Sequence, residues 1–133
     1  AFAMQNGPMK SLLDGIGNLD GVGLRPTDYT EADDLLPKLS PQTHVVALDE
    51  RGEILTTQSM YDKITAWRLD GRFTTSAFVI GGADGLDPRV KERANELWRL
   101  SSLTLPHRFA LALLTEQLYR VEQIRLGGPY HRA

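Results

Sequence analysis

Cysteine is absent from this chain of 133 residues, and its absence excludes several kinds of site. The chain cannot form a disulfide framework, an iron–sulfur site or a cysteine–zinc site, and it cannot use a thiol as a nucleophile. Proteins of a reducing compartment commonly lack disulfides. We therefore expect a cytoplasmic protein that depends on a hydrophobic core, which a chain of this length is able to build.

Long apolar runs are missing as well. No stretch approaches the roughly 20 apolar residues that a membrane-spanning helix needs. The first residues, Ala-Phe-Ala-Met-Gln-Asn, lack the basic flank and the apolar stretch of a secretory signal peptide. A composition with 41% hydrophobic and 24% charged residues is typical of globular proteins. These features predict a single domain over residues 1–133 and no membrane partner.

The sequence also lacks the signatures of several common enzyme classes. It contains no G-x-x-x-x-G-K-[ST] and no G-x-G-x-x-G, so P-loop and classical dinucleotide sites are disfavoured. The G-x-S-x-G turn of many serine hydrolases is absent too. Three histidines are present, His44, His107 and His131, but none has a ligand-type partner three or four residues away. We therefore expect no metal site.

What is present is an alternation of short apolar runs with amphipathic segments, which becomes clear from residue 44 onward. Residues 1–43 have a weaker pattern, with a short helix expected over Thr30–Leu39. Beyond them the expected order of elements is a strand at His44–Leu48, a helix at Thr57–Asp70, a strand at Ser76–Ile80, a helix from Asp87-Pro88 to about Trp98, a strand at Leu100–Leu105 and a helix at His107–Leu126. A turn at Asp49–Gly52 is expected to end the first strand.

This alternation predicts an α/β fold in which helices cover a parallel sheet. Ligands of such sheets bind in the loops beyond the carboxyl ends of the strands. The corresponding loops here are Asp49–Leu55, Gly81–Asp87 and Pro106-His107. The glycine-rich stretch Gly81–Gly85 suits a close approach of the backbone to a ligand, although an ordinary tight turn explains it equally well.

Charge is distributed unevenly along the chain. Residues 1–50 contain three basic and eight acidic side chains, whereas residues 98–133 contain five arginines and two glutamates. The C-terminal third is therefore suited to a polyanionic partner, although a solvated helix face would have the same composition. The last residues, Tyr130, His131 and Arg132, offer groups that stack on a base, share a proton and bind a phosphate. A frayed chain end is the alternative reading of this tail.

Five segments together are more specific than any one of them. They are Val-Ala-Leu-Asp-Glu-Arg-Gly at 46–52, Phe-Val-Ile-Gly-Gly-Ala-Asp-Gly-Leu at 78–86, Leu-Ser-Ser-Leu-Thr-Leu-Pro-His at 100–107, Glu-Gln-Leu-Tyr-Arg at 116–120 and Pro-Tyr-His-Arg at 129–132. In order and spacing they resemble the ribosomal RNA large subunit methyltransferase H family, which belongs to the SPOUT class. The resemblance covers residues 44–133, while residues 1–43 diverge.

The resemblance implies a SPOUT-type parallel sheet flanked by helices, with a C-terminal trefoil knot of the kind that few folds contain. It implies a homodimer that uses S-adenosylmethionine to methylate N3 of a pseudouridine in 23S rRNA of the assembled ribosome. Two alternatives stay open: a catalytically idle module of the same fold that binds RNA or ribosomes, and a SPOUT tRNA methyltransferase.

Site residues follow from the same resemblance. It implies that the tail Tyr130, His131 and Arg132 reaches the active site of the partner subunit. The roles there are our own hypothesis from side-chain chemistry: His131 accepts the N3 proton, because histidine titrates near neutrality, Arg132 stabilises an anion or a phosphate, and Tyr130 positions the base. Arg120 is expected to face RNA or the dimer interface. The implied cofactor contacts are Leu48, Gly82, Ser101, Ser102, Leu103, Thr104, Leu105 and Pro106.

The N-terminal part departs from the family. Members begin with a buried strand followed by a helix, but Ala1–Met9 does not have the pattern of a strand and Leu12–Leu24 is interrupted by glycines. An absent strand would leave a sheet edge uncovered, which bears on stability and on dimer geometry.

Overall fold

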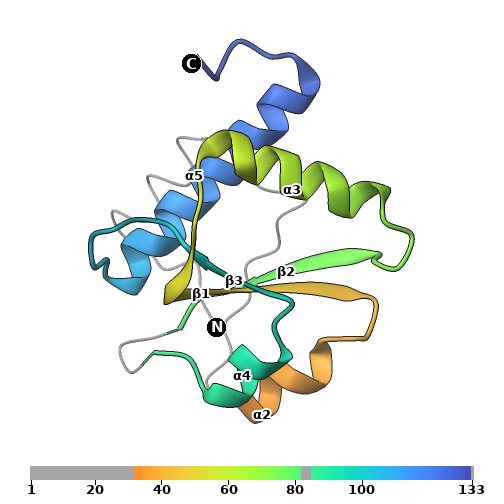
Figure 1. Cartoon of the computed structure of the whole chain (residues 1–133), viewed down its shortest axis with the longest axis vertical. Coiled ribbons are helices and arrows are strands. Elements are labelled where there is room, and N and C mark those ends of the chain that lie inside the picture. Colours follow the sequence, from red (N-terminus) through yellow and green to blue (C-terminus); the bar gives the residue numbers. More distant parts are fainter. Residues whose placement is uncertain (1–31, 82–84, 133) are drawn as a thin grey trace.

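A computed structural model describes residues 32–81 and 85–132 of the chain. Its centre is a three-stranded sheet in the order β2-β1-β3, made of β1 (Thr43–Ile54), β2 (Thr75–Val79) and β3 (Glu96–Arg99) (Figure 1). Both neighbours run parallel to β1, and Val46 lies opposite Phe78 on one side and Glu96 on the other. The expected α/β fold with a parallel sheet is therefore confirmed.

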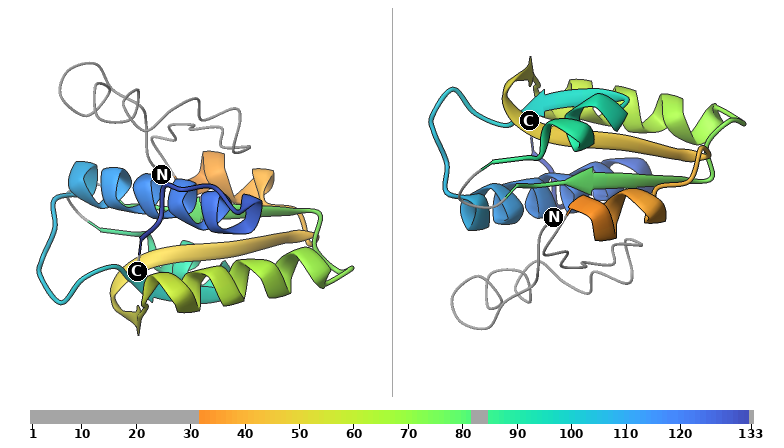
Figure 2. Two further views of the ribbon diagram at one scale, coloured as in Figure 1. Left: turned by 90° about the horizontal axis from the view of Figure 1, so that it is seen from above. Right: turned by 90° about the horizontal axis from the view of Figure 1, so that it is seen from below.

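Helices cover both faces of this sheet. Seen from above in Figure 2, α3 (Thr57–Leu69) and α5 (His107–Leu126) lie side by side over one face. The view from below shows the other face, with α4 (Pro88–Arg93) and the short α2 (Ala32–Leu35), which a 3₁₀ turn at Leu36–Lys38 extends. Alternate residues of β1 serve the two layers: Val46 packs under α3 and α5, and Val45 packs against α2 and α4.

The two long helices agree with the sequence pattern. Thr56 caps α3 by accepting from the Ser59 backbone, and the Ser59 side chain accepts in return from the Thr56 backbone. Helix α5 ends at Gly127, whose φ of 72° is the left-handed conformation that glycine favours. The predicted apolar faces point into the core, with Met60, Ile64 and Trp67 on α3 and Leu111, Leu114, Leu118 and Val121 on α5.

The prediction of a helix reaching Trp98 is wrong, because α4 ends at Arg93. Asn95 then pairs with β1: its backbone N–H donates to the Val45 carbonyl and its side-chain oxygen accepts from the Val45 N–H, both at 2.8 Å. This pairing draws the chain into the sheet, and Glu96–Arg99 continues as β3. The third strand thus begins four residues and ends six residues earlier than expected, and the predicted strand Leu100–Leu105 is a segment with neither helix nor strand.

The first strand is longer than predicted, because it continues past the expected turn at Asp49–Gly52 to Ile54. The pairing with β3 shifts there, so that Leu48 and Glu53 both lie opposite Trp98. Gly52 makes this possible: a Cβ at that position would lie 2.6 Å from the carbonyl carbons of Leu97 and Trp98. The turn-forming residues therefore become an irregularity within the strand.

At the N-terminal end of the described residues, the helix expected over Thr30–Leu39 is present in part, as α2 and the 3₁₀ turn that follows it. Leu35 anchors this piece in the core with Val45, Val79 and Val90. Thr30 lies outside the described residues, so the expected cap is not part of the description. No helix among residues 32–81 and 85–132 is both long and apolar enough to cross a membrane.

Candidate functional site

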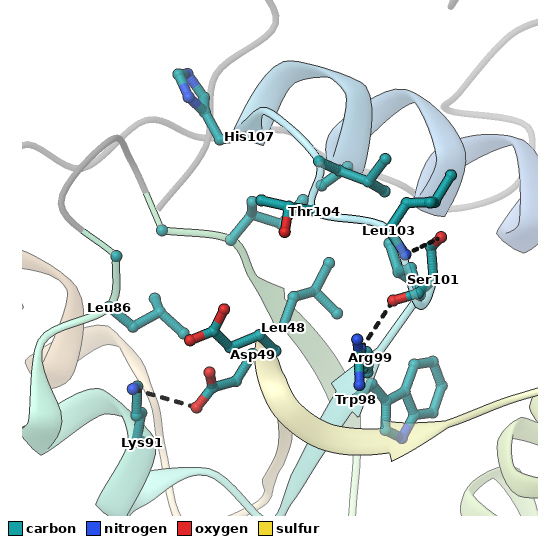
Figure 3. Close-up of a pocket in the computed structure, with 17 residues that line it drawn as sticks. Leu48, Asp49, Leu86, Lys91, Trp98, Arg99, Ser101, Leu103, Thr104 and His107 are labelled. Atoms are coloured by element: carbon teal, nitrogen blue, oxygen red, sulfur yellow. Dashed lines mark hydrogen bonds and ion pairs between the residues drawn. The ribbon is translucent and has the colours of Figure 1, made fainter.

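A cavity of about 540 Å³ lies at the carboxyl ends of the three strands (Figure 3). This is the edge of a parallel sheet where ligands bind. Its walls come from the end of β1, the loop after β2, α4, the end of β3, the segment 100–106 and the first turn of α5. The lining residues are Leu48, Asp49, Glu50, Ile80, Gly81, Gly85, Leu86, Lys91, Trp98, Arg99, Leu100, Ser101, Leu103, Thr104, Leu105, His107 and Ala110.

The structure brings most of the expected cofactor residues to this cavity. Those that line it are Leu48, Ser101, Leu103, Thr104 and Leu105. Ser102 and Pro106 belong to the same segment without lining the cavity, and Gly82 lies outside the described residues. The segment has no regular structure, so its backbone groups are not paired in a ladder. Three of them have side-chain partners, since the Ser101 and Ser102 carbonyls accept from Arg99 and the Leu103 N–H donates to the Ser101 hydroxyl.

Asp49 is a pocket residue that the sequence reading did not single out. Its side chain is 10% exposed, and its carboxylate lies 3.1 Å from the Lys91 ammonium group. Burial alone would raise the pKa of Asp49, but hydrogen bonds from Lys91 and from the Arg51 backbone, together with their charges, lower it instead. Asp49 therefore contributes a fixed negative charge to the cavity. The signal was available, since Asp49 opens a loop at the end of a predicted strand.

Trp98 and Arg99 were missed for a different reason. Both were expected in or just after a helix, whereas they end β3 and thereby reach the cavity. Trp98 is fully buried between the cavity and the core. Arg99 points toward the segment 100–106 and donates to its backbone (Figure 3). Correct placement of β3 was needed before either residue could be assigned to the site.

The C-terminal tail lies against its own helix α5, in a cluster that we call the tail clasp: Glu116, Tyr119, Arg120, Tyr130 and His131. Glu116 accepts from Arg120 at 2.6 and 3.0 Å, and from the Tyr130 hydroxyl at 3.1 Å. The Arg120 guanidinium stacks over the Tyr130 ring at 4.9 Å, and the Tyr119 ring meets Tyr130 edge-on. Burial and the hydrogen bond to Glu116 raise the pKa of Tyr130.

The clasp also determines which ring nitrogen carries the proton in neutral His131. Its Nδ1 lies 3.1 Å from the Arg120 guanidinium. A guanidinium group only donates, so Nδ1 accepts and a neutral ring carries its proton on Nε2. Arg132 is exposed beyond this contact.

The clasp and the cavity lie at opposite parts of α5. His107 and Ala110 line the cavity, whereas the clasp is built on Glu116–Arg120. From Ala110 of the cavity to Glu116 of the clasp the helix rises by about 9 Å, and neither Tyr130 nor His131 lines the cavity. The structure therefore groups Tyr130 and His131 with Arg120 but does not bring this tail to the cavity of its own chain.

The described residues contain no cluster of three or more histidine, aspartate or glutamate side chains that could hold a metal ion. His44 is buried in a structural role: its Nε2 lies 2.7 Å from Glu96, and its ring packs against Trp67 with centroids 4.1 Å apart. The pairing with Glu96 extends to Lys63 and to the Trp98 indole N–H. This network ties α3 to β1 and β3.

Comparisons with known proteins agree with this geometry. A family model described as "Predicted SPOUT methyltransferase" matches residues 25–131. Similar curated proteins are named Ribosomal RNA large subunit methyltransferase H. That of Polynucleobacter necessarius subsp. necessarius is 56% identical over 68% of this chain and 65% of its own length. That of Polynucleobacter asymbioticus is 50% identical over 80% and 71%. That of Burkholderia thailandensis is 56% identical over 74% and 60%.

The chain thus spans between about three fifths and seven tenths of the length of these three relatives. The family model, by contrast, covers well over half of the chain and includes β1, β2, β3 and the whole of α5. The cavity described above lies entirely within the matched residues. The chain belongs to the SPOUT methyltransferase family.

Proposed function

We propose that this chain is an S-adenosylmethionine-dependent methyltransferase that modifies N3 of a pseudouridine in 23S rRNA of the assembled ribosome. The cavity at the carboxyl ends of the strands carries the proposal, because its wall is the irregular segment 100–106 on which the family resemblance places the cofactor contacts. Membership of the SPOUT family and the names of the relatives support the activity and the choice of rRNA.

The residues present fit S-adenosylmethionine. At about 540 Å³ the cavity lies within the usual range of small-molecule sites, roughly 300–1,000 Å³. Aliphatic side chains such as Leu48, Leu86 and Leu105 suit the flat, neutral adenine, and the backbone of residues 100–106 offers hydrogen-bonding groups to it. Gly81 and Gly85, which both line the cavity, lie close together, because a Cβ on Gly81 would lie 2.6 Å from the Gly85 carbonyl carbon. When bound, the cofactor supplies an activated methyl group.

The tail supplies the remaining groups from a second copy of the chain. In one chain, six residues of α5, a rise of about 9 Å, separate Ala110 of the cavity from Glu116 of the clasp, and neither Tyr130 nor His131 lines the cavity. A homodimer in which the tail of one subunit faces the cavity of the other resolves this separation. The trefoil knot of the SPOUT class, formed by the C-terminal segment, is part of the same proposal.

Within such a site, the chain's residues handle the target base. The N3 atom must lose its proton as the new N–C bond forms, and His131 or a water molecule accepts it. Since Arg120 occupies Nδ1 in the clasp, His131 acts as a base only after this contact is released. Arg132 stabilises the developing anion or a neighbouring phosphate, and Tyr130 orients the base. Alignment of the reacting atoms is the main contribution required of the enzyme.

A calorimetric titration of the purified chain with S-adenosylmethionine tests the cofactor, and methyl transfer to ribosomes then tests the substrate. Saturable binding followed by transfer to ribosomes supports the proposal. Binding without transfer to ribosomes, but with transfer to bulk tRNA, supports the tRNA methyltransferase. A folded chain that binds ribosomes but no cofactor is the idle binding module. His131→Ala with wild-type rates from about pH 6 to 9 removes His131 as the base.

A further inference from the structure

Arg99 connects the end of the sheet to the irregular wall of the cavity. Its Nε donates to the Ser101 carbonyl at 2.9 Å, and its Nη2 donates to the Ser102 carbonyl at 3.0 Å. Both acceptors lie in the segment 100–106, and Arg99 itself lines the cavity. A single side chain thus holds two successive carbonyl groups of the cavity wall.

Both ends of this connection are fixed by other contacts. On the sheet side, Arg99 pairs with Ile54 of β1, and the preceding Trp98 is fully buried. On the wall side, the Leu103 N–H donates to the Ser101 hydroxyl at 3.0 Å, which closes the turn that Arg99 holds. The position of the turn relative to the sheet therefore depends on the Arg99 side chain.

The chemistry requires arginine in particular. A planar guanidinium presents N–H donors at a fixed spacing, so it satisfies two carbonyl groups at once. A lysine ammonium group at the end of a flexible chain does not reproduce this two-point contact. Because residues 100–106 form neither helix nor strand, no backbone ladder of their own holds them in place.

We propose that Arg99 is a positioning residue that holds the turn 101–103 in the shape that completes the cofactor cavity. It acts through the backbone of Ser101 and Ser102 rather than on the transferred group. The identity of the ligand rests on the proposed function, whereas the effect on the turn does not. Loss of Arg99 is therefore expected to weaken cofactor binding and to leave the transfer step at saturating cofactor largely unchanged.

The first test needs no ligand. Amide hydrogen exchange is measured on the full chain and on Arg99→Ala, Arg99→Lys and Arg108→Ala. Arg108 is the matched control, because it is an exposed arginine of the first turn of α5 and does not line the cavity. We expect exchange at residues 101–105 to rise about tenfold in Arg99→Ala, less in Arg99→Lys, and not at all in Arg108→Ala. Unchanged exchange in Arg99→Ala overturns the proposal.

The second test is titration with S-adenosylmethionine, with methyl transfer where the substrate permits it. We expect Kd and the KM for the cofactor to rise about tenfold in Arg99→Ala, with kcat within about twofold of the wild type. Arg99→Lys, which keeps the charge and the size, guards against a variant that fails to fold. Faster exchange with an unchanged Kd overturns the link between the turn and affinity. A wild-type chain that does not bind the cofactor overturns the proposed function, while the exchange test still decides the role of Arg99.

Discussion

Two regions that follow one another at the end of β3 are stabilised in different ways. One is the face of the sheet beneath α3 and α5, and the other is the wall of the cavity. Under the helices, Trp67 and Trp98 stack with ring centroids 5.5 Å apart, and Phe78 lies 5.5 Å from Trp98. Five residues after Trp98, Leu103 is 72% exposed in the wall. The core owes its stability to buried aromatic and aliphatic surface, whereas the wall depends on a few hydrogen bonds.

This difference means that stability and binding can be altered separately. Substitutions under the helices should change the free energy of unfolding, because they remove buried contacts. Substitutions in the wall should change ligand affinity with little effect on unfolding, because their side chains contribute little buried surface. Four variants test this separation.

Trp98→Ala is expected to have the largest effect. The side chain is fully buried, and its indole N–H donates to Glu96 at 3.2 Å. Truncation leaves a cavity in the core between the sheet and helices α3 and α5, and should lower the free energy of unfolding by about 3–5 kcal/mol. Urea unfolding measures the change. A loss below about 1 kcal/mol would show that the stacked rings do not form the core.

Gly52→Ala tests the boundary between the two regions. An added Cβ meets backbone carbons of Leu97 and Trp98 at 2.6 Å, and backbone atoms move less readily than a side chain. We expect a destabilisation of about 1–3 kcal/mol in thermal or urea unfolding. Gly71→Ala is the control, since nothing lies within 4 Å of a Cβ there, and it should stay within about 0.5 kcal/mol of the wild type. Equal effects at the two glycines would contradict the close packing of β1 on β3.

Glu122 gives the core a measurable pH dependence. Hydrogen bonds from Arg125 and Arg68 outweigh its burial and lower its pKa from 4.5 to about 2. The native state therefore binds fewer protons than the unfolded state in this range, so stability is fully present above about pH 4.5 and is lost as the pH falls toward about 2. With both arginines partly exposed, the contribution should be about 1–2 kcal/mol.

Glu122→Gln should remove that part of the acid dependence, as measured by urea unfolding at a series of pH values. Glu92→Gln, at an exposed position of α4, changes the same charge and should keep the wild-type profile. Parallel pH profiles for the wild type and Glu122→Gln would contradict the contribution assigned to the two arginines.

Leu103→Ala should have the smallest effect on stability, within about 0.5 kcal/mol, because most of the side chain is already in solvent. Since Leu103 lines the cavity, we expect its truncation to weaken S-adenosylmethionine binding by about threefold to tenfold. Calorimetry and urea unfolding on the same sample give both quantities. A large loss of stability with unchanged affinity would reverse the comparison on which these predictions depend.

Periodicity predicted the parts of the fold whose side chains are sorted by the core. The face of α3 with Met60, Ile64 and Trp67 and that of α5 with Leu111 and Leu114 were predicted because buried and exposed positions differ in polarity. The prediction of a helix reaching Trp98 failed because Val90, Ala94 and Leu97 have helical spacing in the sequence whether or not the helix continues past Arg93. What ends α4 is the pairing of Asn95 with Val45, a contact across 50 residues that no local pattern contains.

The lining of the cavity was predicted to a similar extent, while its role as a cofactor site stays a prediction. The family resemblance pointed to the segment 100–106, and five of the contacts that it implies line the cavity. Asp49 and Lys91 line it too, although neither was among the implied contacts. The Asp49–Lys91 pair joins β1 to α4, and the Arg99 contacts depend on where β3 ends. Both are consequences of tertiary arrangement, so they became visible only with the sheet in place.

Helix α5 carries a cavity wall at its first turn and the tail clasp more than two turns later. The length of α5 and the rotation of its residues around the helix axis therefore set where the tail of a chain lies relative to the cavity of the same chain. One alanine inserted between Ala112 and Thr115 would lengthen the helix by only about 1.5 Å but would rotate the clasp by about 100° around the helix axis. A substitution of one residue does not change this rotation. In the proposed dimer, the register of α5 would therefore affect the active site as much as the residues at the two ends of the helix.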